Sequence, residues 1–177
     1  MILQTARLRL RPFAAADIPA YAAIRADPEV MRHMPGGTAR AATAEADAAR
    51  IVPRFAQDWQ RHGYGPWAVE DRATGVLLGH GGLRMLAELG GETEVLYMLA
   101  RDAWGRGFAS EIATAAQEAG FGTFGLTRLV GYAALANLAS CRVLEKTGLA
   151  FEREVEVFGL TARRHVMERV EGRRPGR

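Results

Sequence analysis

The chain has 177 residues, of which 49% are hydrophobic and 24% charged, a composition typical of a folded globular protein rather than a disordered or fibrous one. This length suits one domain, which we expect to span residues 1–170, followed by a short, frayed basic tail over 171–177. Basic and acidic residues nearly balance, 23 against 20, so the charge does not indicate a nucleic-acid-binding protein. All but one of the basic residues are arginine, which permits an anionic ligand because arginine binds phosphate well.

The cysteine content and the hydropathy favour a cytoplasmic protein. Cys141 is the only cysteine, so no internal disulfide can form, which fits a reducing compartment. The first residues carry charges at every second position, unlike the apolar run of a secretory signal. No uncharged apolar segment reaches the ~18 residues of a membrane span. We therefore expect a cytoplasmic protein without a membrane or nucleic-acid partner.

The first half of the chain predicts one strand, two helices and three more strands. Residues 5–13 alternate apolar and basic side chains, which predicts a half-buried strand. Alanine-rich residues 14–26 predict a helix, and residues 42–62 predict a long helix kinked or interrupted at Pro53. Three strand-like runs follow between 65 and 100, and the sequence DRATG predicts a hairpin turn between the first two.

The second half alternates between helices and strands. Residues 106–124 predict a helix that begins at a pair of glycines, and residues 128–135 predict a strand. Residues 137–148 predict a helix with asparagine at its N-cap and glycine at its C-terminal end. Two alternating segments, 149–159 and 163–170, predict a closing hairpin. This order indicates a mixed α+β fold, with one central sheet and helices on both faces.

The glycine-rich turn before the helix at 106–124 has the features of an anion-binding site. Its glycines allow a tight turn, and the first N–H groups and the dipole of the helix attract negative charge. A phosphate-binding P-loop would need a Gly-Lys-Ser/Thr sequence, and no lysine lies nearby. A dinucleotide motif would need glycine or alanine at Ser110 and an acidic residue after the next strand, and both are missing.

The turn reads WGRGFASE, and a later helix reads NLASCRVLEKTGL. Together with the opening RLRLRPF, the WAVED hairpin and the strand ending in YML, these motifs resemble the GNAT N-acetyltransferases in order and spacing. The resemblance is closest to the branch of the ribosomal-protein N-terminal acetyltransferases. It implies a GNAT fold, with a central, mostly antiparallel sheet of about seven strands that splay apart in the middle. It also implies acetyl-CoA as co-substrate.

The resemblance further implies which residues bind coenzyme A. The pyrophosphate would lie on the glycine turn, which comprises Trp104, Gly105, Arg106, Gly107, Phe108, Ala109 and Ser110. Trp104 stands where most family members have glutamine or arginine. The pantetheine arm would pair with backbone groups near Tyr97, Met98 and Leu99, and the N–H of Met98 or Leu99 would polarise the thioester carbonyl. Asn137 matches the family's pantetheine-binding asparagine, although its position also predicts a helix cap. Ser140, one helical turn further on the same face, would also contact the cofactor.

Catalysis would be direct attack of an amine on the thioester, which requires a base to remove the amine's proton. Glu94 is our first candidate base and Glu92 the second. Strand alternation alone does not decide which face each side chain occupies, because a bulge would change it. Many family members protonate the leaving thiolate with a tyrosine at the position of Leu144. Here Ser140 or a water would act instead, or the thiolate, with a pKa near ~8.5, would leave unaided.

Several other polar and aromatic residues need no catalytic role. Cys141 is expected to be a packed side chain, and the four histidines lack the spacing of metal ligands, so no metal is expected. Trp59, Tyr64 and Trp67 are expected in the core, although they could also line an acceptor pocket. The resemblance also implies that the loop at 31–38 lies on the acceptor side and determines specificity.

The sequence therefore predicts an N-acetyltransferase that uses acetyl-CoA to acetylate a primary amine, either on a protein N-terminus or on a small molecule, as a monomer or homodimer. The alternative is a GNAT-fold module that binds acyl-CoA without turnover, as a sensor or scaffold. The apolar Leu144 is the feature that favours this alternative.

Overall fold

A computed structural model describes residues 1–169, and the predicted basic tail lies outside these residues. They form one open sheet of eight strands in the order β1-β2-β3-β4-β5-β6-β8-β7. The strands are β1 (Leu3–Gln4), β2 (Leu8–Arg11), β3 (Pro66–Asp71), β4 (Leu77–Leu86), β5 (Glu92–Leu99), β6 (Arg128–Ala134), β7 (Ala150–Val157) and β8 (Leu160–Glu168). The α-helices are α1 (Ile18–Arg25), α2 (Pro28–Met31), α3 (Ala44–His62), α4 (Phe108–Glu118) and α5 (Leu138–Lys146).

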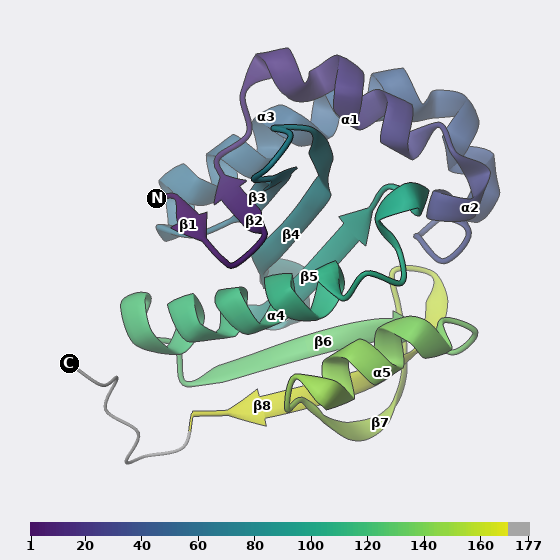
Figure 1. Cartoon of the computed structure of the whole chain (residues 1–177). Helices are drawn as coiled ribbons and strands as arrows, with labels where there is room; N and C mark the ends of the chain where they lie inside the picture. Colours follow the sequence, from purple (N-terminus) through teal and green to yellow (C-terminus); the bar gives the residue numbers. More distant parts are fainter. Residues whose placement is uncertain (170–177) are drawn as a thin grey trace.

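The helices cover both faces of this sheet, which confirms the mixed α/β layout (Figure 1). On one face, α1 and α3 pack Tyr21, Val52 and Phe55 against Ala68 and Met98 of the sheet. On the other, α4 packs its apolar side over the central strands, and α5 covers β6. Strands therefore carry apolar side chains in both directions, as a sheet between two helical layers must.

The sheet is antiparallel except between β5 and β6, which confirms the expected interruption in its middle. These two strands run parallel and share one pairing, Glu94 with Val130. By contrast, β4 pairs with β5 without a break from Leu86↔Glu92 to Gly79↔Leu99. Beyond Glu94, β5 and β6 diverge, and a gap opens toward the carboxyl end of β5.

Most predicted elements are found, and the differences have physical causes. Of the two predictions for Pro53, the interruption is wrong, because α3 runs unbroken from Ala44 to His62, and the kink stays a prediction. Pro53 is exposed, while its neighbour Val52 and Phe55 are buried, so packing on the opposite side offsets the lost hydrogen bond. The predicted helix over 106–124 is regular only to Glu118, and it continues as a π-helical turn over Ala119–Thr123.

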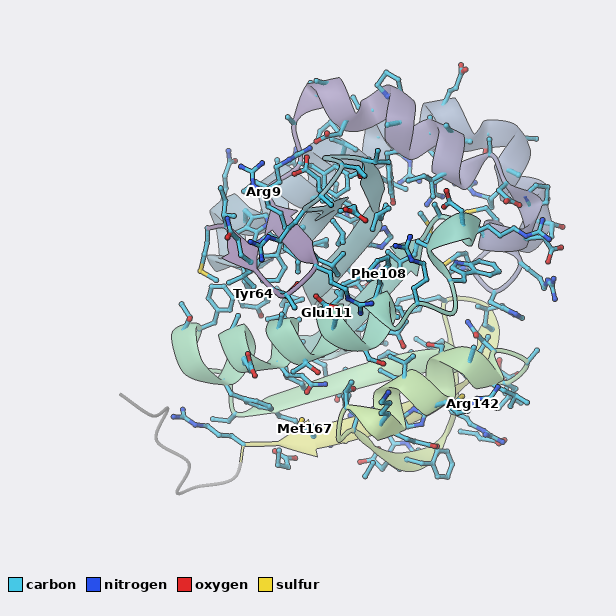
Figure 2. All side chains as sticks on the ribbon, in the orientation of Figure 1. Arg9, Tyr64, Phe108, Glu111, Arg142 and Met167 are labelled. Atoms are coloured by element: carbon cyan, nitrogen blue, oxygen red, sulfur yellow. The ribbon has the colours of Figure 1, made fainter. Side chains whose placement is uncertain are left out.

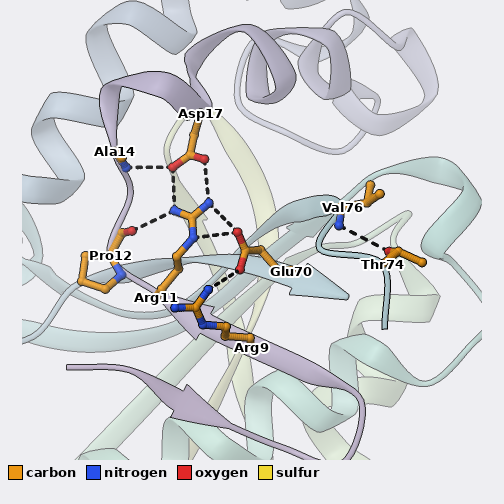
Figure 3. A network of polar contacts seen from close by, with 8 residues as sticks. All are labelled: Arg9, Arg11, Pro12, Ala14, Asp17, Glu70, Thr74 and Val76. Carbon is orange, nitrogen blue, oxygen red and sulfur yellow. Dashed lines mark hydrogen bonds and ion pairs between the residues drawn. The ribbon is translucent and has the colours of Figure 1, made fainter. Parts of the chain in front are cut away.

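Arg11 joins β2, β3 and the segment that leads into α1 (Figure 3). Its guanidinium donates two hydrogen bonds of 2.7 Å to the Asp17 carboxylate and one of 2.7 Å to Glu70. Asp17 also accepts from the Ala14 N–H, at 2.7 Å, and so caps the chain as it turns. These charge-assisted bonds fix the start of α1 relative to the edge of the sheet.

Gly81 on β4 allows α4 to lie close to the sheet. A Cβ atom at this position would lie 2.4 Å from Ile112 Cγ2 of α4. We expect Gly81→Ala to lower the free energy of unfolding in urea by about 1–3 kcal/mol, because the helix must move outward. Gly122→Ala is the control, since its Cβ would meet no atom within 4 Å. Equal stability of the two variants would contradict this account of the packing.

Candidate functional site

The glycine turn presents a row of free backbone donors at the start of α4. Gly105 and Gly107 have φ angles of 71° and 80°, in the left-handed region that favours glycine, and Gly107 is the N-cap of α4. The first bond into the helix runs from the Glu111 N–H to the Gly107 oxygen, at 3.1 Å. Within residues 1–169, the N–H groups of residues 105–110 have no hydrogen-bond acceptor. Together with the helix dipole, they form a site for an anion.

Arg7, directly before β2, holds this turn in place, and sequence reasoning did not identify it. Its Nε donates to Glu111 at 2.8 Å, its backbone N–H to the same carboxylate at 2.9 Å, and its Nη1 to the Arg106 oxygen at 2.8 Å. The guanidinium groups of Arg7 and Arg106 lie 4.5 Å and 4.6 Å from the ring centre of Phe108. Figure 2 shows Phe108 and Glu111 at the start of α4. No local pattern links residue 7 to this turn, so the sequence could not reveal the contact.

Burial disfavours the charged form of Glu111, but hydrogen bonds from Thr5 and Arg7 outweigh it and hold the pKa of Glu111 below its ordinary value. The carboxylate therefore stays charged beside the turn at neutral pH. Glu111 thus positions Arg7 beside the turn, in addition to its favourable place at the N-terminus of the helix dipole.

Trp104 ties the turn to the end of β5. Its Nε1 donates a 2.9 Å hydrogen bond to the Leu99 oxygen, while the side chain is 46% exposed. The Ala100 N–H donates to the Leu78 oxygen of β4, at 2.8 Å. Along an antiparallel strand, the backbone N–H and C=O groups of successive residues point alternately to one neighbouring strand and to the other. The backbone groups of Met98, like those of Ala100, therefore point toward β4. Those of Tyr97 and Leu99 point the other way, into the gap. This alternation places the backbone of Leu99, not that of Met98, at the gap.

The side chain of Tyr97 crosses the gap toward α5. Its hydroxyl lies 3.0 Å from Ser140 Oγ and 3.2 Å from the Ser140 carbonyl oxygen. Asn137 Oδ1 accepts from the Ser140 N–H, at 3.1 Å, which confirms the predicted helix cap. Burial raises the pKa of Tyr97 to about 12, so the phenol stays protonated at neutral pH. Leu144, one turn after Ser140, is buried.

A cavity of about 630 Å³ extends from this gap to the helical layer of α1 and α3. Tyr97 and Ser140 line it at the gap, and Glu94 and His80 line it on the other face of the sheet. The unbroken register of β4 and β5 contains no bulge, so Glu94 shares the face of Met98, whose side chain packs in the α1 and α3 layer. The single cavity thus reaches both faces of β5.

Glu94 and Glu92 have different environments, although they lie on the same side of β5. Glu94 is 6% exposed, and its Oε2 lies 2.7 Å from Arg84 Nη2. Burial outweighs this partner and raises the pKa of Glu94. Glu92 instead binds Arg164 and the Tyr132 hydroxyl, and these hydrogen bonds outweigh burial and lower the pKa of Glu92. Glu94 lines the cavity and Glu92 does not.

His80 is a cavity residue for which sequence reasoning found no role. Its Nδ1 lies 3.0 Å from the Tyr21 hydroxyl. Burial, with smaller contributions from Arg25 and Arg84, lowers the pKa of His80 to about 3, so the imidazole is neutral at physiological pH. It therefore shapes the cavity wall without adding a charge.

Other predicted residues occupy the core or the cavity rim. Cys141 is buried among Ala133, Leu144 and Leu149, as expected of a packed side chain. The three aromatic residues expected in the core lie there: Tyr64 and Trp67 are buried, and Trp59 packs against the same cluster. From the acceptor-side loop at 31–38, the cavity is lined by Met31, His33, Met34, Pro35 and Gly36. Among the described residues, no helix is long and apolar enough to span a membrane, and no acidic, histidine or cysteine cluster is arranged to bind a metal ion.

Residues 7–150 match the family model described as an acetyltransferase (GNAT) domain. The chain belongs to the GNAT acetyltransferase family. One GNAT relative is the uncharacterized N-acetyltransferase YoaA of Bacillus subtilis, which is 33% identical over 153 residues, or 86% of this chain and 84% of YoaA. A GNAT-family acetyltransferase from Bacillus anthracis has a similar structure, with a TM-score of 0.77 and 23% identity over 95% of this chain and 98% of that one.

A further similar structure is that of RimL, a ribosomal L7/L12 α-N-protein acetyltransferase solved in complex with coenzyme A. Its TM-score is 0.79 at 14% identity, over 95% of this chain and 98% of RimL. At these identities, the structural likenesses establish the GNAT fold for this chain and nothing finer. The ribosomal-protein branch that the sequence motifs resemble is thus represented among its structural neighbours.

The Glu111 contacts predict a pH-dependent contribution to stability. Because its folded pKa is lowered, this contribution is present above the ordinary glutamate pKa of about 4.5 and is lost as the pH falls through the folded value. We expect Glu111→Gln to lower the free energy of unfolding by about 1–2 kcal/mol at pH 7, and the difference from the parent to shrink on acidification. Glu118→Gln, on the exposed end of α4, is the control. A Glu111→Gln deficit that stays constant down to pH 3 in urea unfolding would disprove the assignment.

Proposed function

We propose that this GNAT protein is an acetyl-CoA-dependent N-acetyltransferase that acetylates a primary amine on a small molecule or a protein N-terminus. The observation that carries the proposal is the cavity that joins Glu94, on one face of β5, with Tyr97 and Ser140 in the gap on the other side. An amine and a thioester entering from opposite faces would meet beside β5. A cytoplasmic location and a monomeric or homodimeric state remain predictions from the sequence.

The glycine turn and the gap fit coenzyme A. Acetyl-CoA supplies an acetyl group activated as a thioester. The free N–H groups of the turn suit a pyrophosphate, and Arg106 forms no ion pair with a carboxylate within residues 1–169. The backbone groups of Tyr97 and Leu99 would pair with the amides of an extended pantetheine arm. We therefore assign the hydrogen bond that polarises the thioester carbonyl to the Leu99 N–H rather than to Met98.

We assign the role of general base to Glu94. A base has to accept a proton near neutral pH, so a carboxylate with a raised pKa suits the task better than one with a lowered pKa. Glu94 meets this condition, whereas the pKa of Glu92 is lowered and that of His80 is about 3. Arg84 holds the Glu94 carboxylate in one orientation, at 2.7 Å.

We infer that Ser140 and Tyr97, whose hydroxyl oxygens lie 3.0 Å apart at the gap, contact the leaving sulfur. A phenol with a pKa of about 12 does not fully protonate a thiolate whose pKa is about 8.5. The two hydroxyls would therefore stabilise the thiolate by donating a hydrogen bond, and solvent would protonate it. Many family members have a tyrosine at the position of Leu144 on α5. Here Tyr97, on β5, would supply the phenol instead.

A GNAT-fold module that binds acyl-CoA without turnover is the second candidate, favoured by the buried, apolar Leu144. Thiol release from acetyl-CoA, measured across a panel of primary amines, separates the two functions. Turnover of any amine above background supports the enzyme. Tight acetyl-CoA binding without turnover of any amine would support the module.

Gly107→Glu tests the coenzyme A site. The new carboxylate would repel the pyrophosphate, and the φ angle of 80° disfavours any side chain. We expect calorimetric affinity for acetyl-CoA to fall at least about 100-fold, or about 2.7 kcal/mol. Gly75→Glu is the matched control, because Gly75 has a similar φ of 73° in the hairpin between β3 and β4, with open space around it. Unchanged affinity in a folded Gly107→Glu protein would refute the site.

Glu94→Gln tests the base. Removing a general base costs on the order of 100-fold in rate, so we expect kcat to fall by about this factor at pH 7. Acetyl-CoA affinity should stay close to that of the parent. Because the Glu94 pKa is raised, the parent rate should rise with pH as Glu94 deprotonates. This rising limb of the pH–rate profile should disappear in the variant. Glu92→Gln should keep the limb. A Glu94→Gln pH–rate profile that overlays the parent's would exclude Glu94 as the base.

A further inference from the structure

The part of the cavity between α1, α3 and Glu94, where the proposed amine would lie, is called the acceptor half here. Arginine dominates the charged side chains around it. The lining contains five arginines and two carboxylates. The arginines are Arg25, Arg40, Arg50, Arg54 and Arg84, and the carboxylates are Asp58 and Glu94. They come from α1, the segment before α3, α3 itself, β4 and β5, so the positive charge surrounds the space next to the proposed base.

The nearby carboxylates do not neutralise this charge. Glu94 is bound to Arg84, and Asp47, buried on α3, is shared by Arg25, Arg50 and Arg40. Even if Asp58 and Asp47 are both counted in full with Glu94, three carboxylates face five guanidinium groups. Two positive charges therefore remain without a carboxylate partner in the cavity wall.

Arg25 shows that part of this charge is buried and incompletely paired. The residue is 5% exposed, and its Nε has no hydrogen-bond partner within residues 1–169. Its nearest carboxylate oxygen, on Asp47, lies 3.6 Å from Nη2, and its Nη1 lies 3.9 Å from Met98 Sδ. A buried charge is costly unless it is paired and hydrogen-bonded. An anionic group in the cavity would supply the missing partner.

Helix periodicity extends this positive wall along α3. Arg50, Arg54 and Asp58 recur at every fourth residue, so they lie on one face of the helix, and all three line the cavity. Arg54 is exposed and forms no ion pair among the described residues. Its guanidinium therefore has no carboxylate partner, and it lines the same cavity as the buried Arg25.

We propose that the acceptor is an amine that also carries a carboxylate or phosphate group, which Arg25 and Arg54 bind while the amine lies at Glu94. This inference rests on the proposed function and names its substrate class. Arg25 contacts Met98, and Glu94 lies four residues earlier on β5, so the two charged ends are separated by up to ~13 Å. A short peptide or another elongated amino acid conjugate spans this length. A polyamine or an aminoglycoside brings only positive charge, which the arginines repel.

Four amidated tripeptides test the charge preference, because they differ in one side chain: Ala-Gly-Asp, Ala-Gly-Asn, Ala-Gly-Lys and Ala-Gly-phosphoserine. We expect kcat/KM to be about tenfold higher with Asp or phosphoserine than with Asn, and lower still with Lys. The Asp and phosphoserine peptides show whether the site prefers a carboxylate or a phosphate. Spermidine and kanamycin represent the polycationic amines and should be poor acceptors.

Arg54→Gln should lower the preference for Asp over Asn about fivefold without changing acetyl-CoA affinity, because Arg54 is exposed and lies outside the proposed coenzyme A site. Arg61→Gln is the matched control, since Arg61 is exposed on the same helix but does not line the cavity. Equal or better turnover of the Asn or Lys peptide would overturn the inference while the acetyltransferase function stands.

Calorimetric binding of the same peptides in the presence of coenzyme A separates the inference from the proposed function. If no peptide is acetylated but the Asp or phosphoserine peptide binds preferentially, the anion site stands and the catalytic proposal fails. If there is neither turnover nor charge-dependent binding, the inference is refuted.

Discussion

The single pairing between β5 and β6 is the constraint on which the candidate site depends. A parallel pair normally continues along both strands, but here the only shared position is Glu94 with Val130. Beyond it, the backbone groups of Tyr97 and Leu99 have lost a strand partner, and Trp104 satisfies the oxygen of Leu99. Unpaired backbone groups in the middle of a sheet are costly, so this gap is suited to an extended ligand that carries amides of its own.

The same divergence makes β5 a strand with two chemical faces. Glu94 projects toward α1 and α3, where the charged side chains gather, whereas Tyr97 reaches Ser140 on α5. In a closed sheet, these faces would be separated by a continuous layer of backbone. Because the sheet opens directly after Glu94, one cavity reaches both sides. The Glu94 carboxylate and the hydroxyls of Tyr97 and Ser140 therefore face one cavity from opposite sides of the strand.

Sequence reasoning succeeded where a feature depends on neighbouring residues. The glycine turn, the Asn137 cap and the hairpin turn after β3 each follow from a few adjacent side chains. It could not find contacts between distant segments, such as that of Arg7 with Glu111 or of Tyr97 with Ser140. The choice between Glu92 and Glu94 was of this kind as well. Both have the same strand parity. Burial raises the pKa of Glu94 despite Arg84, whereas hydrogen bonds from Tyr132 and Arg164 lower that of Glu92. The expected interruption at Pro53 is absent because burial on the opposite side of α3, not local propensity, keeps that helix continuous.

The near-exclusive use of arginine has a chemical consequence at the acceptor half of the cavity. A lysine at the buried position of Arg25 would tend to lose its proton, since burial disfavours an ammonium, whereas a guanidinium stays charged at any physiological pH. The positive charge of the cavity is therefore constant over the range in which amines titrate. Like charges repel, so this charge lowers the pKa of an amine held beside it and favours the neutral form that can attack an acyl group. The bond to Arg84 makes the Glu94 carboxylate a weaker base. A weaker base is sufficient when the amine proton is already less tightly held.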